Sequence, residues 1–189
     1  MPLIGENVVL REVRVDDNPY FQMLRNDMET QGFNQSLPPD YTIGMIASQS
    51  SEKKFSFERV DGNFTIEEKN SGIFVGRISY SGYEKRHTAA VGIALLKDFW
   101  GKGYGYEAHE LLLKFLFLEL GVRVVRWYTT SENIGSYKLA QKSGYQISVR
   151  KPEAIFKSGK LFDMLMLDLI RDDYFAQHPE LTDELRLLP

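Results

Sequence analysis

Length, composition and charge limit what this chain can be. Its 189 residues suffice for one sizeable core, so we predict a single domain. Hydrophobic residues make up 43% and charged residues 26%, which is typical of a globular protein and too apolar for disorder. The net charge of -3 gives no broad basic field for nucleic-acid phosphates, and the lack of cysteine excludes disulfides, thiolate metal sites and an acyl-cysteine relay.

The sequence also carries no targeting or membrane signal. Its first residues lack a basic region followed by an apolar stretch. The longest apolar run, residues 111–118, contains Lys114 and is too short to span a bilayer. We therefore expect a cytoplasmic protein without a membrane partner.

The first half of the chain reads as strand, two helices and an antiparallel meander. Alternating apolar and charged residues predict a strand over residues 8–15, and the run Asp16-Asp17-Asn18-Pro19 predicts a helix start. That helix reaches about Gly32, and consecutive prolines at Pro38-Pro39 predict a loop before a short helix at residues 43–53. Strand-like composition from Phe55 onward predicts strands over residues 64–68, 73–83 and 88–96.

The second half alternates helices and strands. A broad apolar face predicts a helix over residues 107–120, which Gly121 ends in a left-handed cap. A strand over residues 122–130, a helix over 136–142 and a strand pair at 145–150 and 161–169 follow, and Lys157-Ser158-Gly159-Lys160 predicts the hairpin turn. The tail from 171 is a peripheral helix or a loose arm. We predict an α/β fold with a mixed, mainly antiparallel sheet of about seven strands and about four helices.

A glycine-rich turn carries the first functional signal. Trp100-Gly101-Lys102-Gly103-Tyr104-Gly105 lies between a predicted strand and a predicted helix. Glycines let the backbone approach a ligand closely, and the N–H groups that open a helix form an anion site that suits a pyrophosphate. The alternative is a tight connection without a ligand. A dinucleotide fingerprint fails at Tyr106, and a P-loop fails because Lys102 is followed by Gly103.

A second segment makes the pattern specific. It runs Glu132-Asn133-Ile134-Gly135-Ser136-Tyr137-Lys138-Leu139-Ala140-Gln141-Lys142-Ser143-Gly144-Tyr145. Together with the glycine turn it resembles the GNAT superfamily of acetyltransferases, and most closely the branch that acetylates ribosomal-protein N-termini. The resemblance spans residues 8–174 and includes the late segment 156–163. It implies a GNAT-type sheet splayed near its middle, with a domain over residues 1–175 and a tail over 176–189.

The resemblance implies acetyl-CoA as the acyl donor and places its contacts. In the family, the turn wraps the pyrophosphate, and the preceding strand pairs its backbone with the pantetheine amides where it splays from the strand at residues 124–128. Asn133 matches a position that touches the pantetheine arm; the alternative is a residue of the helix N-terminal turn. The expected donor contacts are Ile93, Leu95, Trp100, Gly101, Lys102, Gly103, Tyr104, Gly105, Asn133 and Ser136.

The catalytic groups depart from the family pattern. Many members place a tyrosine acid at the position of Ala140 and a glutamate base at that of Ala90. In the ribosomal branch the hydroxyl matching Ser136 is a candidate to protonate the leaving thiolate, although Ser136 could instead cap its helix. Tyr128 and Tyr137 are further candidate proton donors, and the alternative for each is a packing role. We expect Glu84 to be the carboxylate nearest to the splayed strands and, with water, a candidate proton acceptor.

Other chemistry-bearing residues fit structural roles. His87, His109 and His178 have no metal-ligand spacing, so we predict no metal site. Asp163 follows a hairpin turn and is expected to anchor local hydrogen bonds. The aromatic residues Phe33, Tyr41, Phe55 and Phe57 are either core residues or part of an acceptor pocket.

These observations predict an N-acetyltransferase that uses a ternary complex. Without a fixed base, an acceptor of low pKa is favoured, because an α-amine is about 10% neutral at pH 7 and a lysine amine only about 0.04%. We therefore expect a protein or peptide N-terminus as acceptor. The alternatives are an acetyltransferase for a small amine, such as a polyamine, an aminoglycoside or an amino-acid derivative, and a non-catalytic acyl-CoA sensor. Family members often form homodimers.

Overall fold

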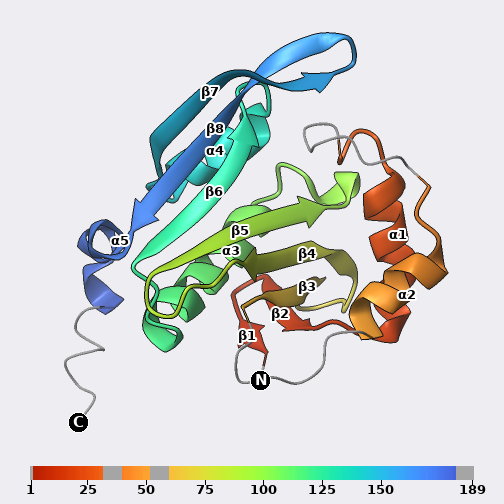
Figure 1. Cartoon of the computed structure of the whole chain (residues 1–189). Coiled ribbons are helices and arrows are strands. Elements are labelled where there is room, and N and C mark those ends of the chain that lie inside the picture. The colour runs from red at the N-terminus through yellow and green to blue at the C-terminus, as the bar shows by residue number, and fades with distance from the viewer. Residues whose placement is uncertain (1, 32–39, 52–59, 182–189) are drawn as a thin grey trace.

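One twisted eight-stranded sheet runs through the molecule (Figure 1). The computed structural model describes residues 2–31, 40–51 and 60–181. The spatial order of the strands is β1-β2-β3-β4-β5-β6-β8-β7, and every neighbouring pair is antiparallel except β5 and β6. The strands are β1 (Leu3–Ile4), β2 (Val8–Glu12), β3 (Gly62–Glu68), β4 (Phe74–Ser81), β5 (Thr88–Leu95), β6 (Val124–Thr130), β7 (Gln146–Lys157) and β8 (Lys160–Ile170).

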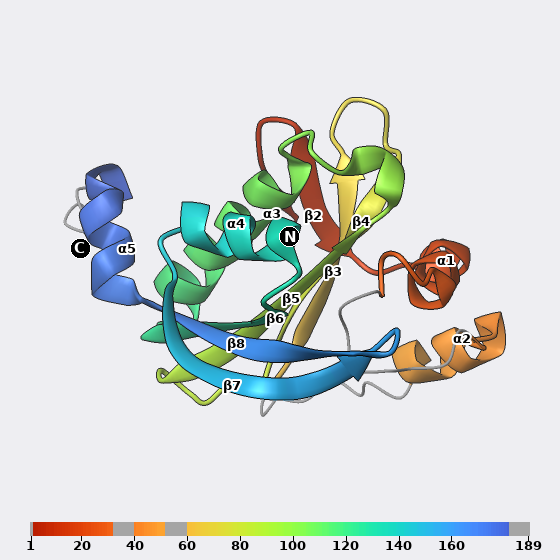
Figure 2. The same cartoon turned by 90° about the horizontal axis from the view of Figure 1, so that it is seen from above.

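Helices cover both faces of this sheet. Seen from above, α3 and α4 lie on one side and α1 and α2 on the other (Figure 2). The helices are α1 (Asn18–Asn26), α2 (Ile43–Ser51), α3 (Tyr104–Lys114), α4 (Ile134–Lys142) and α5 (Arg171–Gln177). A π-helical turn at Phe115–Glu119 extends α3, and Gly121 follows with the left-handed φ of 65° that its predicted capping role requires.

The main core lies between α3 and the sheet. Leu112, Leu113 and Leu116 of the α3 segment are fully buried against strand residues such as Val125 and Leu167. Each leucine stabilises the fold by about 2 kcal/mol through removal of apolar surface from water. This packing fixes the direction in which α3 leaves its glycine-rich start.

A buried ion pair anchors α1. Arg11 of β2 donates to Asp17 through Nη1 at 2.8 Å and Nη2 at 2.9 Å, and the Thr65 hydroxyl donates to the same carboxylate at 2.7 Å. Burial raises the pKa of Asp17, but the hydrogen bonds from Arg11, the Arg14 backbone and Thr65 outweigh it, so the pKa lies below its ordinary value. The helix start predicted at this acidic run is therefore held to the sheet.

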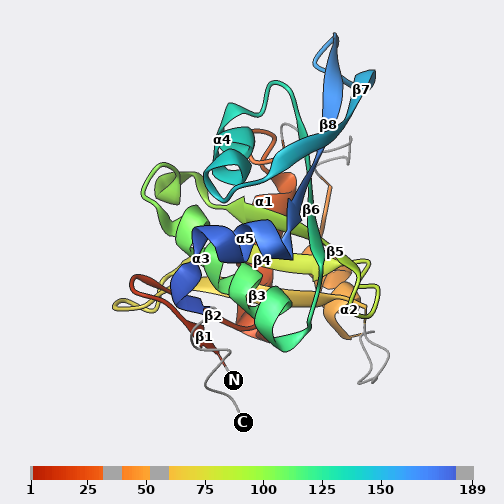
Figure 3. The same ribbon diagram turned by 90° about the vertical axis from the view of Figure 1, so that its left-hand side faces the viewer.

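The β7–β8 hairpin projects beyond the rest of the sheet (Figure 3). Its turn is the one predicted from sequence, with Ser158 and Gly159 both at positive φ. Asp163 accepts from the Glu153 backbone at 2.9 Å and from Arg150 Nε at 2.6 Å, which confirms its local anchoring role. These bonds span the irregular register near Glu153 and let β7 continue to Lys157, well past the predicted end at residue 150.

Several other boundaries differ from the sequence-based expectations. The two-residue strand β1 was not predicted, and β2 ends at Glu12 rather than at residue 15. The tail is not a loose arm at its start, because Tyr174 of α5 is fully buried in the main core. Phe33, Phe55, Phe57, the Pro38-Pro39 loop and the end of the short helix at residue 53 lie outside the described residues.

Candidate functional site

The parallel strands β5 and β6 pair over only part of their length. Their pairing ends where Val91 lies opposite Trp127. Beyond this point β5 continues on β4 to Leu95, while β6 continues on β8 to Thr130. Figure 1 shows the two strands diverging. We call the unpaired segment between residues 92–95 of β5 and 128–130 of β6 the notch.

Backbone groups of β5 face the notch at alternate residues. The Leu96 N–H donates to the Val75 carbonyl at 3.0 Å and therefore points to β4. Because successive residues of a strand direct their backbone groups to opposite sides, Ala94 also faces β4, whereas Ile93 and Leu95 face the notch. Such unpaired strand groups need another hydrogen-bonding partner.

The glycine-rich turn lies next to this edge. Gly101 and Gly103 have φ values of 72° and 87°, and an added Cβ would meet nothing within 4 Å at either position. The helix α3 begins at Tyr104, and no side chain in the described part of the chain caps it. The first N–H groups of α3 are consequently free to bind an anion, where the helix dipole adds to their attraction.

Gly105 joins the turn to the strand and to α4. A Cβ placed on it would lie 3.2 Å from Leu95 Cδ1, 3.4 Å from Leu139 Cδ1 and 3.8 Å from Ile93 Cδ1. Gly105 is buried, and its lack of a side chain lets α3 start directly against β5. The anion-binding end of α3 and the notch are therefore parts of one site.

At the turn, Trp100 is hydrogen-bonded to β5, whereas Lys102 is exposed. The Trp100 indole N–H donates to the Leu95 carbonyl at 2.9 Å, so this notch-facing acceptor already has a partner. Lys102 is exposed, and its ammonium lies 5.4 Å from the centre of the Phe99 ring. An exposed lysine beside the free N–H groups adds positive charge to the anion site.

The start of α4 places the Ser136 hydroxyl beside Trp127, the last residue of β6 that pairs with β5. Asn133 is the N-cap of α4, because its Oδ1 accepts from the Ser136 N–H at 3.1 Å. This confirms the prediction that Asn133 belongs to the N-terminal turn of the helix. The alternative in which Ser136 caps the helix is therefore wrong. The Ser136 hydroxyl accepts from the Trp127 indole N–H at 2.8 Å.

Trp127 is itself held by a buried histidine. The His109 ring packs edge-on to Trp127 with centroids 4.9 Å apart, and its two nitrogens lie 3.1 Å from Ser143 Oγ and from Tyr145 Oη. His109 is completely buried, and burial lowers the pKa of its imidazole to about 3. His109 is therefore neutral and supports Trp127 from behind. The sequence predicts a helix at residue 109 but carries no sign of this network.

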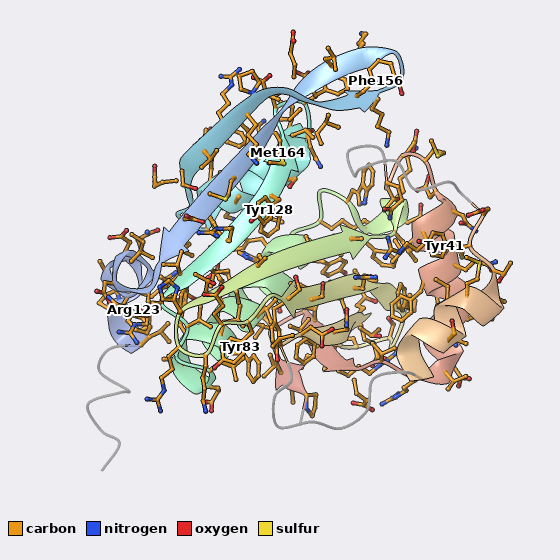
Figure 4. All side chains as sticks on the ribbon, in the orientation of Figure 1. Tyr41, Tyr83, Arg123, Tyr128, Phe156 and Met164 are labelled. Atoms are coloured by element: carbon orange, nitrogen blue, oxygen red, sulfur yellow. The ribbon has the colours of Figure 1, made fainter. Side chains whose placement is uncertain are left out.

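Three hydroxyl-bearing residues, Tyr128, Thr129 and Thr130, follow one another on the part of β6 that does not pair with β5. Tyr128 is the first residue of β6 beyond the segment that pairs with β5, and it is 49% exposed. Figure 4 shows it on β6 where this strand diverges from β5. The Thr129 and Thr130 hydroxyls are buried without a hydrogen-bond partner among the described residues. The Tyr137 hydroxyl is farther along α4 and accepts from Gln141 Nε2 at 2.9 Å.

The prediction that Glu84 lies nearest to the notch is wrong. Glu84 precedes Thr88, which pairs with Val124 at the closed end of β5 and β6. At about 3.3 Å per residue, Thr88 is about 13 Å along β5 from Gly92, where the notch begins. Glu84 is exposed and faces His87 Nδ1 at 3.9 Å. Ala90 also lies in the paired segment, opposite Arg126.

Within residues 2–31, 40–51 and 60–181, no group of three or more His, Asp or Glu side chains could hold a metal ion. No helix in these ranges has both the length and the apolar character needed to cross a membrane.

Comparison with known proteins identifies the family. A family model described as an acetyltransferase (GNAT) domain matches residues 7–146. The chain belongs to this family. The uncharacterized N-acetyltransferase YokL, derived from the SPbeta prophage of Bacillus subtilis strain 168, is 26% identical over 180 residues, which cover 92% of this chain and 96% of the relative.

Solved GNAT structures share the fold. Spermidine N-acetyltransferase from Vibrio cholerae, in complex with CoA and spermine, has a TM-score of 0.82 at 15% identity and covers 90% of this chain and 99% of its own. A second Vibrio cholerae structure, provisionally named a ribosomal-protein-serine acetyltransferase, has a TM-score of 0.70 at 18% identity and covers 90% and 97%. The protein is thus an acetyl-CoA-dependent N-acetyltransferase of the GNAT family.

The GNAT chain brings most of the sequence-predicted donor contacts together. The notch-facing residues Ile93 and Leu95, the turn from Trp100 to Gly105 and the Asn133–Ser136 turn meet around Gly105 and Trp127. Free helix N–H groups suit a pyrophosphate, and unpaired strand groups suit the amides of an extended arm. The residues present therefore fit a CoA thioester, whereas Glu84 is separated from them.

A hollow that the sequence did not reveal lies on the other face of the GNAT sheet. It has a volume of about 130 Å³ and is lined by residues of α1, β4 and β5 and by Gln31, which follows α1. Arg77 and Ser79 of β4 belong to this face, because they alternate with Ile78, which is buried in the main core. We call it the α1 hollow. Its polar lining residues are Arg25, Gln31, Arg77 and Ser79, and Gly92 and Ala94 of β5 complete this part of its wall.

Proposed function

We propose that the notch binds acetyl-CoA and that the acceptor is the α-amine of a peptide or protein N-terminus. The observation that carries the donor site is the end of β5–β6 pairing directly beside the uncapped start of α3. In this proposal the first N–H groups of α3, at Tyr104 and Gly105, hold the pyrophosphate with Lys102. Gly101 and Gly103 give the turn its left-handed backbone.

The pantetheine arm would continue along β5. The backbone of Ile93 and the N–H of Leu95 are suited to pair with its amides, and the Leu95 carbonyl keeps its bond from Trp100. Asn133 shapes the turn that brings the Ser136 hydroxyl to the notch. This arrangement leaves the thioester near the boundary between paired and unpaired strands.

The reaction proposed is direct transfer without an acyl-enzyme. The neutral amine attacks the thioester carbonyl carbon, a C–N bond forms and the C–S bond breaks. The nitrogen loses one proton to water, the leaving sulfur gains one from the Ser136 hydroxyl, and Ser136 takes a proton back from water, so the enzyme is unchanged at the end of the step. Because the Trp127 indole N–H donates to Ser136 Oγ, the hydroxyl hydrogen of Ser136 is available for donation.

The choice of an α-amine rests on the chemistry around the notch. No described carboxylate lines the α1 hollow, and His109 is buried behind Trp127. A site without a strong base favours an amine that is already partly neutral, and an α-amine with a pKa of about 7.8 meets this condition far better than a lysine at about 10.4.

A small amine is the second candidate acceptor. The observation that favours it is the fold shared with the Vibrio cholerae spermidine N-acetyltransferase. Spermidine carries several ammonium groups, so a groove built for it should present negative charge. The arginines of the α1 hollow have the opposite sign, which favours the peptide end over a polyamine.

A pH profile tests the acceptor class. Two peptides of equal length and charge would be compared, one with a free α-amine and a blocked lysine, the other acetylated at its N-terminus with a free lysine. We expect kcat/KM for the α-amine to be larger, with a midpoint at about pH 7.8 and a plateau above about pH 9, where that amine is neutral. A higher kcat/KM for the lysine peptide at pH 7 would contradict the α-amine proposal.

A further inference from the structure

The α1 hollow contains an arginine without a described counterion. Among the described residues, Arg11, Arg126 and Arg150 each lie within 3 Å of a carboxylate oxygen. Arg77 has no such partner in the described part of the chain, although it is only partly exposed. A guanidinium that is removed from water without a counterion is destabilising, so its position favours the binding of an anion.

Arg25 adds a second positive charge to the same hollow. Burial, and then the nearby Arg25, lowers the pKa of Arg77 to about 10, so the Arg77 guanidinium stays charged at neutral pH. The Arg25 guanidinium also lies 5.3 Å from the centre of the Tyr41 ring, which limits its movement. Two guanidinium groups in one hollow provide several N–H donors for a carboxylate or phosphate.

The hairpin tip brings a third cation to the rim. Lys157 Nζ donates to the Gln31 carbonyl at 2.6 Å, and Gln31 lines the hollow. Burial lowers the pKa of Lys157. Arg25, Arg77 and Lys157 come from α1, β4 and β7, so the fold gathers positive charge here in a chain whose net charge is -3.

The hollow reaches the strand on which the chemistry is proposed to occur. Gly92, Ile93 and Ala94 of β5 form part of its wall, and the backbone of Ile93 faces the notch. An added Cβ on Gly92 would meet only Ser79 Oγ, at 3.7 Å, within 4 Å. The volume of about 130 Å³ is well above the roughly 15 Å³ that one water molecule requires.

We propose that the acceptor amine carries an anionic group, a carboxylate, which Arg77 and Arg25 bind in the α1 hollow while the amine lies at the notch. The proposal rests on the acetyltransferase function proposed above and adds a carboxylate to its α-amine acceptor. The carboxylate belongs either to an acidic side chain next to a peptide N-terminus or to the α-carboxylate of an amino acid.

Matched acceptors test the charge and its source. The first pair is Ser-Glu-Ala amide and Ser-Gln-Ala amide, and the second is free serine and serine amide. In at least one pair the wild-type protein should acetylate the anionic member with about 10-fold higher kcat/KM, as expected for a charge-assisted hydrogen bond. The pair that shows the difference identifies the source of the carboxylate. Equal use of both members in both pairs, or faster acetylation of spermidine, overturns the proposal.

Variants assign the effect to Arg77. Arg77→Gln should reduce the preference to less than about 3-fold by raising KM for the anionic member alone, and Arg77→Lys should retain part of it. Lys85→Gln is the control, because Lys85 is exposed beyond the closed end of β5 and its loss changes the net charge equally. A loss of activity toward both members of a pair in Arg77→Gln, at unchanged melting temperature, overturns the role of Arg77.

A binding measurement separates this proposal from the function on which it rests. Calorimetry of N-acetyl-Ser-Glu-Ala amide and N-acetylserine with the CoA-free protein should show binding of one of them to wild type and about 10-fold weaker binding to Arg77→Gln. Equal affinity for the two proteins overturns the anion site. Failure of wild type to bind acetyl-CoA, by contrast, contradicts the donor site and leaves this anion measurement interpretable.

Discussion

The indole N–H of Trp127 donates to the hydroxyl of Ser136 at 2.8 Å, across the junction of β6 and α4. Trp127 is also the last residue of β6 that pairs with β5. Trp127 therefore marks the end of the pairing between β5 and β6, and it also orients the hydroxyl proposed to protonate the leaving sulfur. The His109 network behind Trp127 keeps this geometry rigid.

Replacement of Ser136 by alanine tests the proton donor. We expect kcat to fall about 100-fold, as is common when a general acid is removed, with acetyl-CoA affinity little changed. Ser148→Ala is the matched control, because the Ser148 hydroxyl bonds the Met166 carbonyl on the exposed hairpin. Steady-state kinetics would reveal the difference. Full kcat in Ser136→Ala, with a loss in Tyr128→Phe, would transfer the role to Tyr128.

Gly103→Ala tests the donor site through its backbone. Gly103 has a φ of 87° and open space around its Cα, so alanine should cost about 1 kcal/mol of stability through backbone strain. Gly72→Ala is a close control, because Gly72 has a φ of 69° and equally open surroundings in the β3–β4 turn.

The two glycine variants should differ once CoA is added. Saturating CoA stabilises a protein by about 2.7 kcal/mol at 100 times Kd, and this gain should shrink in Gly103→Ala and persist in Gly72→Ala. Thermal melts with and without CoA provide the measurement. An equal gain in the two variants would show that the turn at Gly103 does not contact the donor.

Local sequence rules predicted the backbone geometry of the glycine-rich turn and of the start of α4. Gly101 and Gly103 adopt the left-handed backbone conformation, which costs other residues free energy, and asparagine, as at Asn133, is a favoured N-cap residue. Such preferences depend on only a few neighbouring residues, so a single sequence is enough to predict them. The hairpin turn at Ser158 and Gly159 was predictable for the same reason.

Long-range pairing explains the failures. Glu84 precedes β5 closely in sequence, but the register of β5 against β6 decides which end of the strand is open, and no local pattern encodes that register. The α1 hollow depends on Arg25 and Arg77, which are 52 positions apart and meet only after α1 packs on the sheet. Asp163 extends β7 by bonds to residues at 150 and 153 that the strand pattern did not suggest.

Acid stability should depend on Asp17. Its pKa is lower in the folded than in the unfolded chain, so the ionised carboxylate contributes stability above its ordinary pKa of 3.8, and this contribution is lost as the pH falls through the folded value. Asp17→Asn should lose about 3 kcal/mol at pH 7, because Arg11 loses a buried partner, and should lose less additional stability than wild type below about pH 4.

Urea denaturation at pH 7 and at pH 3 measures both effects. Asp16→Asn is the control, because Asp16 is the exposed neighbour of Asp17. Equal stability losses in the Asp16 and Asp17 variants at pH 7 would show that the pair with Arg11 does not anchor α1. A destabilised α1 should also weaken acceptor use, since α1 carries Arg25.

Gly92→Val separates the acceptor side of the site from the donor side. Gly92 is exposed on β5, and its added Cβ would meet only Ser79 Oγ within 4 Å, so a β-branched residue fits the strand without a clash with packed atoms. The valine side chain would instead fill part of the α1 hollow. We expect kcat/KM for the acceptor to fall on the order of 10-fold by steric exclusion.

The donor side should not respond to this change. The side chain of residue 92 points to the face of α1, whereas the neighbouring Ile93 packs toward Gly105 on the face of α3. Acetyl-CoA affinity, measured by calorimetry, should therefore stay within about 2-fold of wild type. Ala90→Val is the control on the same strand and face, in the segment paired with β6. A parallel loss of donor and acceptor binding in Gly92→Val would mean that both substrates share one face of β5, which would contradict the placement of the acceptor in the α1 hollow.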